Sequence, residues 1–168
     1  NNFPGVDVEK DPCLKYEFII NNLNLLHWFC IKPILNAFGG EDILIKSAYR
    51  SMELNQALGG NPKSGHIRGY AIDIISKNAG NGLLWNWCFN NLPEYNQLIW
   101  EYPEKGNFSS IYTPDTSWVH ISYVKGNNPK TSSFSSKRED LHEMYEGEQT
   151  HRLGDYTHNI TIAEERLI

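Results

Sequence analysis

The chain lacks three features that would point to common classes of function. It has no basic excess, because 15 Lys and Arg residues against 20 Asp and Glu residues leave a formal net charge of −5. No uninterrupted apolar run approaches the roughly 20 residues that a membrane-spanning helix needs. No glycine-rich phosphate loop, serine nucleophile elbow or internal repeat stands out. We therefore expect no nucleic-acid partner and no membrane insertion.

Cysteine is scarce as well. The three cysteines, Cys13, Cys30 and Cys88, are odd in number and lack the spacing of metal ligands. Cys30 and Cys88 fall in apolar segments with helical periodicity, where a thiol behaves as a small core side chain. This pattern favours a chain made in a reducing cytoplasm over a secreted, disulfide-bonded one. No signal peptide is seen, and because the chain starts at Asn1 rather than methionine we expect a processed or truncated form.

The composition that remains is that of one folded domain with a tail. Of the 168 residues, 40% are hydrophobic and 12% aromatic, which excludes a disordered chain. Apolar periodicity ends near Lys125, and the asparagine, proline and serine residues that follow are typical of a linker. We therefore predict a folded domain over residues 1–125. Residues 126–168 are predicted to be a polar linker and C-terminal tail without an independent core.

Hydrophobic periodicity predicts the α+β class. A long helix is expected from Leu14 to Phe38, broken near Pro33 because proline removes an internal hydrogen bond. Further helices are expected over residues 52–58 and 82–92, and strands over 43–46, 70–75 and 118–124, with a fourth near Leu98. These strands would form a small, mostly antiparallel sheet with helices on one face.

Two histidines and an aspartate predict a zinc site on the other face of that sheet. His66 and Asp73 lie close together in the sequence, and His120 stands on a later predicted strand. Two neutral imidazoles and one carboxylate give Zn²⁺ three ligands and leave the fourth tetrahedral position open for water, as in catalytic sites. Asp73 falls in an apolar strand, where an unpaired carboxylate would cost several kcal/mol. A metal ion would compensate that charge, and Arg68 is the other candidate.

Glycines flank the first of these histidines. With Gly65 on one side and Gly69 on the other, the backbone around His66 could turn tightly and pass close to a bound ion without interference from a Cβ atom. The site is therefore expected to begin on a loop and to continue on the strand that carries Asp73 inward.

The motifs together match those of a known family. A serine-x-histidine segment is followed by a glycine and an aspartate, and a tryptophan-x-histidine strand comes near the domain end; the residues are Ser64, His66, Gly69, Asp73, Trp118 and His120. Upstream, the run Ser47-Ala48-Tyr49-Arg50-Ser51 fits the same pattern. Over about residues 14–125 the chain resembles the zinc D-alanyl-D-alanine carboxypeptidases and related phage endolysins. Their fold is shared with lysostaphin-type peptidases and the hedgehog signalling domain.

The resemblance implies roles for individual residues. His66, Asp73 and His120 would be the zinc ligands. Arg50 would face the substrate and stabilise charge that develops during hydrolysis. Ser64 and Tyr49 would also contact the substrate.

The proton-transferring acid is less clearly indicated. Many relatives carry an acid three positions before the last histidine, but here that position is Ser117, which cannot act as a base unaided. Glu101 and Asp115 could substitute. We favour Glu101, because it ends an apolar strand that resembles one in the phage-type branch and because desolvation there would raise its pKa. Asp115 follows a proline and would cap a polar turn.

The predicted function is a zinc-dependent peptidase that acts on bacterial peptidoglycan stem peptides or cross-links, as a carboxypeptidase or an endolysin-type endopeptidase. The phage-like strand around Glu101 favours a phage virion, or the host cytoplasm before release to the cell wall. The alternative is a non-catalytic zinc-binding module of a virion or the cell wall. In either case the tail could contact other virion proteins or subunits.

Overall fold

The computed structural model describes residues 14–102 and 117–135 of the chain. The helices in chain order are α1 (Tyr16–Leu26), the π-helical segment η2 (His27–Ile31), α2 (Lys32–Phe38), α3 (Met52–Ala57), the 3-10 turn η3 (Gly65–Arg68) and α4 (Asn81–Asn91). The strands are β1 (Ile43–Ser47), β2 (Ala71–Ser76), β3 (Gln97–Glu101), β4 (Trp118–Ser122) and β5 (Thr131–Ser135). The helices and the four predicted strands differ from the sequence-based predictions mainly at their ends.

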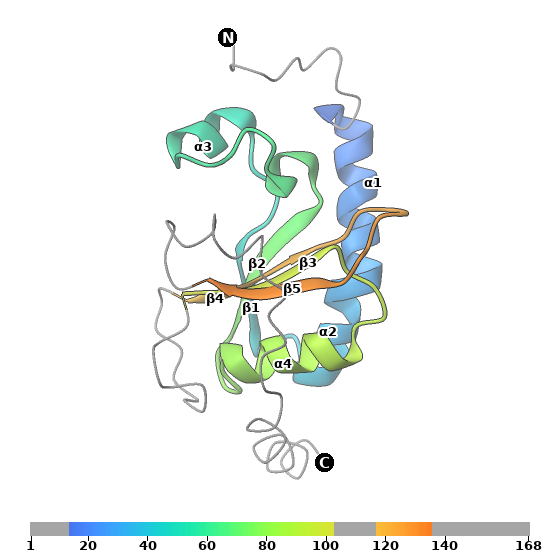
Figure 1. The fold of residues 1–168 in the computed structure, drawn as a ribbon, viewed down its shortest axis with the longest axis vertical. Helices are drawn as coiled ribbons and strands as arrows, with labels where there is room; N and C mark the ends of the chain where they lie inside the picture. The colour runs from blue at the N-terminus through green and yellow to red at the C-terminus, as the bar shows by residue number, and fades with distance from the viewer. Residues whose placement is uncertain (1–13, 103–116, 136–168) are drawn as a thin grey trace.

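The five strands form one sheet in the order β1-β2-β4-β3-β5. Three of the pairings, β1 with β2, β2 with β4 and β4 with β3, are antiparallel, and β5 joins β3 in parallel. Figure 1 shows α4 and α2 on one side of the sheet and α3 on the other. The predicted α+β class with a mostly antiparallel sheet is confirmed.

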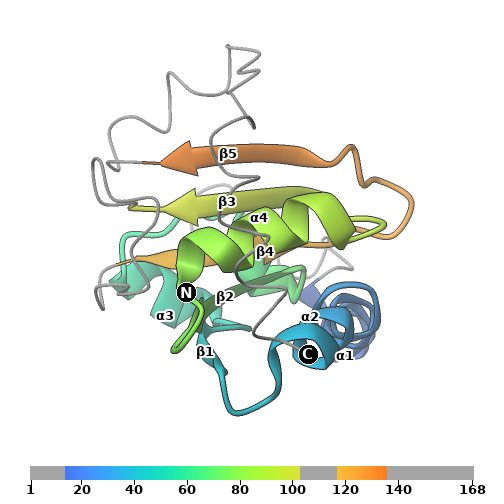
Figure 2. The same cartoon turned by 90° about the horizontal axis from the view of Figure 1, so that it is seen from below.

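The hydrophobic core lies between α4 and the sheet, with α2 and η2 at its side. α4 packs against β2, β3 and β4 and crosses the sheet in Figure 2. Its Leu84 and Cys88 are fully buried, as are Val119 and Ile121 of β4. Because strand side chains alternate between the two faces, the residue between Val119 and Ile121 points to the opposite face. That residue is His120, so packing of the core against α4 directs it toward α3 and η3.

The long N-terminal helix is interrupted as predicted, but the interruption precedes the proline. Pro33 lies in the first turn of α2, and η2 comes directly before it. Proline has no N–H to donate to the preceding turn, and its ring clashes with the carbonyl four residues earlier. A π-helical turn at His27–Ile31 accommodates both effects, so the helix continues in a changed register instead of ending.

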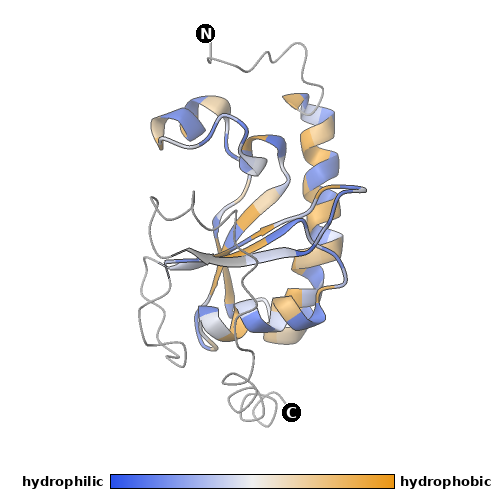
Figure 3. Cartoon of the chain, in the orientation of Figure 1, coloured by the Kyte–Doolittle hydropathy of each residue, from blue (hydrophilic) through white to orange (hydrophobic). Residues whose placement is uncertain are grey.

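The prediction of a linker is wrong for part of the segment. Thr131–Ser135, which the serine-rich composition assigned to a linker, forms β5 at the edge of the sheet, paired with β3. Figure 3 shows β5 in pale colours, whereas the inner strands carry strongly hydrophobic residues. An edge strand has few core-facing positions to fill, and backbone hydrogen bonds hold it to its neighbour. Periodicity in hydrophobicity therefore does not reveal it. The rest of the predicted tail, residues 136–168, lies outside the described residues.

Two of the three cysteines occupy the core, as predicted. Cys30 and Cys88 are free and completely buried. Burial, and then the charge of Glu94, raise the pKa of the Cys30 thiol to about 12. Both cysteines are thus packing residues, while Cys13 lies outside the described residues. Within the described part of the chain, no helix has the length and apolar character needed to cross a membrane.

Candidate metal centre and active site

The three predicted ligands come together from three separate elements. His66 lies on η3, Asp73 on β2 and His120 on β4, and their nearest ligand atoms all lie within 4.8 Å of one another. Nε2 of His66 is 3.3 Å from Oδ1 of Asp73, and Nδ1 of His120 is 2.8 Å from the same oxygen. All three residues are at least nine-tenths buried. They form a compact group of two imidazoles and one carboxylate.

The strand register explains two of these positions. Asp73 and His120 are Cα partners in the β2/β4 ladder, so their side chains leave the sheet side by side on the same face. Ile99 of β3 is the next partner in the same row. The face is the one opposite α4, as predicted. The face is not open to solvent at this point, because His120 is only 9% exposed and Asp73 only 7%.

His66 reaches the group from above the sheet and is held by backbone contacts. Ser64 caps η3, its hydroxyl accepting a hydrogen bond from the backbone N–H of His66 at 3.3 Å. Nδ1 of His66 lies 2.7 Å from the carbonyl oxygen of Ala48, just after β1. A carbonyl only accepts, so in the neutral ring Nδ1 carries the proton and Nε2 keeps its lone pair toward Asp73. Metal-binding histidines usually donate the N–H of their other ring nitrogen to a carbonyl or carboxylate oxygen, which fixes the tautomer in the same way.

Helix α1 supports η3 from the other side. Nδ2 of Asn22 donates a 2.9 Å hydrogen bond to the carbonyl oxygen of Arg68, the last residue of η3. Gly69 has a φ of +71°, and a Cβ atom there would lie 2.7 Å from the carbonyl oxygen of Ile19. We expected Gly69 to make room for an ion. The structure gives a different reason, which is the close approach of α1.

Arg50 lies beside the carboxylate of the group. Nη2 of Arg50 is 3.7 Å from Oδ2 of Asp73, and its backbone N–H donates to the carbonyl oxygen of His66 at 3.2 Å. The Nε atom of Arg50 is buried and has no hydrogen-bond partner among the described residues. The guanidinium is therefore anchored at the edge of the metal group and retains a donor. Arg50 fills the role of a compensating cation for which the sequence suggested Arg68.

The pKa of Asp73 reflects this environment. Burial raises it, but when both rings are protonated the hydrogen bonds from His120 and His66 and the positive charge of the rings outweigh that effect, and the pKa falls well below the usual range. The carboxylate is thus ionised at any pH of interest. An ionised, buried carboxylate between two imidazoles is suited to a cation.

Glu101 is the acid that lies near the group. It ends β3, and its Cα partner is Trp118, which shares a sheet face with His120. Burial raises the pKa of Glu101. The charges of His120 and His66 and the neighbouring indole of Trp118 act in the opposite direction, and the net shift is upward. Glu101 is close enough to feel the charges of both histidines and is poised to take up a proton more readily than an exposed glutamate.

Ser117 faces the opposite side of the sheet. It is 1% exposed, and its hydroxyl accepts hydrogen bonds from Nε1 of Trp100 at 2.8 Å and from Nδ2 of Asn81 at 3.3 Å. The hydroxyl therefore joins β3, the start of α4 and the start of β4 within the core. Asp115, the other acid considered, lies outside the described residues.

The two predicted substrate contacts occupy different settings. Tyr49 is 45% exposed and directly precedes Arg50 in the chain. Ser64 is half-buried, and its oxygen is already engaged with the backbone of η3. Geometry thus gives Ser64 a local role in holding the loop of His66.

The donor set fits zinc in chemistry and spacing. Zinc bonds of about 2.0–2.2 Å to nitrogen and oxygen place tetrahedral ligands roughly 3.4 Å apart. The measured separations of 3.3 Å for His66 to Asp73 and 2.8 Å for His120 to Asp73 lie near that value. The remaining separation, between the two histidine nitrogens, is within 4.8 Å.

Sequence reasoning missed the residues that orient the ligands. Nothing in the sequence marks the carbonyl of Ala48. Asn22 had a signal, because it is a polar residue on the buried stripe of α1 that also includes Ile19 and Leu26. A buried amide on an apolar helix face needs a partner, and η3 provides it.

Comparison with known proteins identifies a family. A family model described as Peptidase M15 matches residues 11–99. This span includes Arg50, His66 and Asp73, whereas Glu101 and His120 lie beyond it. No curated protein matches the chain.

Proposed function

Because the chain belongs to the peptidase M15 family, we propose that it is a zinc-dependent peptidase that hydrolyses peptide bonds in the stem peptides or cross-links of bacterial peptidoglycan. The observation that carries the proposal is the convergence of His66, Asp73 and His120 beside Arg50. Members of this family are typically zinc-dependent, and the same three residues form the group here that could hold a metal.

In this proposal Nε2 of His66, a carboxylate oxygen of Asp73 and Nδ1 of His120 would hold Zn²⁺. The ion would supply Lewis acidity, which polarises a carbonyl group and makes water more acidic. The carbonyl of Ala48 and the register of β2 with β4 hold the ligands in place before the ion arrives. Little reorganisation is then needed on binding.

Arg50 binds the substrate. Its guanidinium stands at the edge of the metal group, with a donor that has no partner among the described residues. It would hydrogen-bond the carbonyl oxygen of the scissile bond, or the terminal carboxylate of the substrate, and so stabilise negative charge that develops there. Loss of one such donor typically lowers the rate by about 10²- to 10³-fold.

Glu101 moves the proton. As a carboxylate with a raised pKa near both histidines, it would take a proton from the attacking water and deliver it to the leaving amine. Tyr49, which is exposed and adjoins Arg50 in the chain, would contact the substrate, and Ser64 would act through the loop of His66.

The choice between carboxypeptidase and endopeptidase depends on the loops around the group. A closed pocket beyond the scissile bond would admit only a free carboxylate, and an open groove would admit cross-linked chains. Resemblance of the β3 strand around Glu101 to the phage-type branch supports a lysis or virion enzyme of a phage, with residues 136–168 as a candidate contact to other virion proteins or subunits.

Digestion of purified peptidoglycan tests the proposal. The wild-type protein with Zn²⁺ should release peptides whose masses identify the cleaved bond, and His120→Ala should release none. Chelation should abolish release by the wild type, and added Zn²⁺ should restore it. Intact peptidoglycan after treatment with zinc-loaded wild-type protein would contradict the proposal and favour the non-catalytic module.

A further inference from the structure

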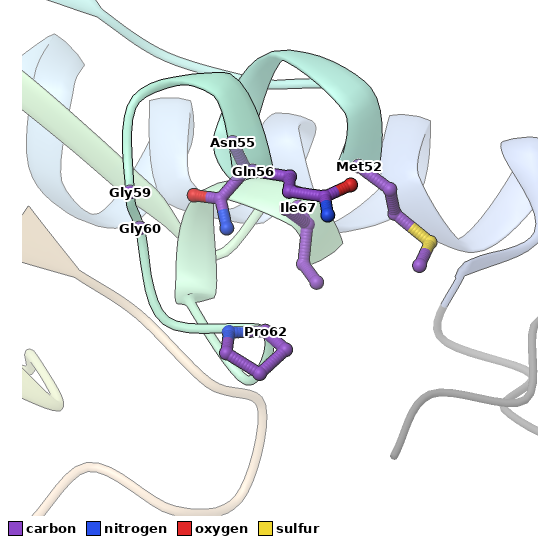
Figure 4. Close-up of a pocket in the computed structure, with 7 residues that line it drawn as sticks. All are labelled: Met52, Asn55, Gln56, Gly59, Gly60, Pro62 and Ile67. Atoms are coloured by element: carbon purple, nitrogen blue, oxygen red, sulfur yellow. The ribbon is translucent and has the colours of Figure 1, made fainter. Parts of the chain in front are cut away.

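A hollow of about 340 Å³ is lined by residues that adjoin His66 and Arg50 in the chain. It is bounded by α3, by the loop that follows α3 and by η3 (Figure 4). Ile67 lies between Met52 and Pro62 in this view and contributes an apolar surface. The volume is within the range of sites that hold small ligands or single side chains.

The frame of the hollow is held by hydrogen bonds. Nδ2 of Asn55 donates to the carbonyl oxygen of Asn61 at 2.9 Å, and the backbone N–H of Gly60 donates to the carbonyl oxygen of Asn55 at 2.8 Å. A Cβ atom at Gly60 would collide with the carboxamide of Asn55, so glycine is needed for this packing. Ser51 caps α3 by accepting a 3.2 Å hydrogen bond from the N–H of Leu54. The hollow is therefore part of the fixed structure and need not be formed by a ligand.

Its walls continue directly from the residues of the candidate centre. Ile67 follows His66 in the chain, and Met52 comes two residues after Arg50. Since neighbouring Cα atoms lie about 3.8 Å apart, the Cα atoms of Ile67 and Met52 lie within roughly 10 Å of those of His66 and Arg50. An extended peptide advances about 3.3 Å per residue, so this distance corresponds to about three residues.

The chemistry of the lining selects the occupant. None of the described residues that line the hollow is charged. Met52, Pro62 and Ile67 offer apolar surface, and Asn55 and Gln56 offer amides. Oδ1 of Asn55 is buried against Gly60 and has no hydrogen-bond partner among the described residues. A charged side chain would lose its hydration here without gaining a counter-ion, so an uncharged one is favoured.

We propose that this hollow is a substrate subsite that receives an uncharged side chain of the peptide, about three residues from the scissile bond. The inference rests on the proposed peptidase function and deepens it. The enzyme would then recognise several consecutive residues of the stem peptide in addition to the scissile bond.

Filling the hollow tests the inference. Met52→Trp and Gln56→Trp place bulk at its rim, and Glu53→Trp adds the same bulk on an exposed position of α3 outside the lining. The substrates are synthetic stem peptides built around the bond that digestion identifies or, if digestion identifies none, around each peptide bond of the stem in turn. They carry Ala, Leu, Lys or Glu three positions from that bond, on each side in turn. We expect the wild type to prefer Ala and Leu. Both lining variants should raise KM for these peptides about tenfold and leave kcat nearly unchanged, and Glu53→Trp should change neither.

A binding measurement separates this inference from the proposed function. The chain has two methionines, Met52 and Met144, so ¹³C-methyl labelling of methionine gives one signal in the hollow and one reference signal. In the Glu101→Gln protein, which would not consume the peptides, the Met52 signal should shift saturably with the Ala and Leu peptides and the Met144 signal should stay. A stationary Met52 signal, or unchanged KM in both lining variants of an active enzyme, would overturn the subsite. Lack of cleavage by the wild type with a shifting Met52 signal would overturn the peptidase function and leave the peptide site supported.

Discussion

Nδ1 of His120 lies 2.8 Å from Oδ1 of Asp73, and the two residues are Cα partners across β2 and β4. The antiparallel ladder alone therefore sets two of the three candidate ligands side by side. The third, His66, depends on η3, which is anchored by the carbonyl of Ala48 and by α1. Two of the candidate ligands, Asp73 and His120, are thus fixed by strand pairing, whereas the position of His66 depends on contacts that hold the short turn η3 in place.

Because Asn22 helps to hold η3, which carries His66, we predict that Asn22 affects the affinity for zinc. Asn22→Ala removes the hydrogen bond to the carbonyl of Arg68, so η3 should hold His66 less firmly. Contacts that orient metal ligands are typically worth about 10- to 100-fold in affinity, and we expect a loss near the lower end. Zinc affinity is measured by competition with a chromogenic chelator. The neighbouring, exposed Asn21→Ala is the control, and equal affinities for the two variants would refute the role of Asn22.

Gly69 should be intolerant of any side chain. The backbone φ of +71° at Gly69 is strained for alanine. In addition, the new Cβ atom of Gly69→Ala would lie 2.7 Å from the carbonyl oxygen of Ile19, which is too close. We expect the free energy of unfolding to fall by about 1–3 kcal/mol in urea denaturation of the metal-free protein. Gly40→Ala has open space around it and should be close to neutral. A neutral Gly69→Ala would mean that α1 does not press on this turn.

Glu101 should be required for turnover and dispensable for zinc. Glu101→Gln keeps the size of the side chain but cannot accept a proton, so kcat should fall by about 10²- to 10⁴-fold with the zinc content unchanged. Asp115→Asn is the matched test of the other acid. If Asp115→Asn alone loses activity, the proton-transferring role passes to Asp115.

The raised pKa of Glu101 also predicts how stability depends on pH in the metal-free protein. A folded-state pKa above the unfolded value means that the folded state binds the proton more tightly. This contribution is complete below the ordinary glutamate pKa of about 4.3 and is lost as the pH rises through the raised value. Compared with Glu101→Gln, the wild type should therefore become less stable as the pH rises from 4 toward 8. Urea denaturation of both proteins across this range checks the sign, and a relative gain in wild-type stability would contradict it.

The sequence was informative in two respects: it contains residue types that bind zinc at a characteristic spacing, and it has hydrophobic residues at the periods of helices and strands. His66, Asp73 and His120 could be grouped because few side chains bind zinc, and their family spacing is specific. Helices and inner strands could be predicted because each buries a periodic apolar face. Sequence reasoning thus reached the α+β sheet and the composition of the centre.

The features that could not be predicted from the sequence depend on contacts between segments that are far apart in the chain. The hydrogen bond from His66 to Ala48 and that from Asn22 to the carbonyl of Arg68 involve backbone carbonyls, which every residue carries. The edge strand β5 has no apolar pattern, because it is held mainly by its pairing with β3. Gly69 could be recognised as special, but the carbonyl of Ile19 that demands it lies a long way off in the sequence.

Zinc titration of the metal-free protein tests the central claim most directly. Wild-type protein should bind one equivalent of Zn²⁺ tightly, and His66→Ala, Asp73→Ala and His120→Ala should each weaken binding by more than 100-fold. His27→Ala, which alters an exposed histidine on η2, should bind as the wild type does. Tight binding of one equivalent by all three ligand variants would contradict the account.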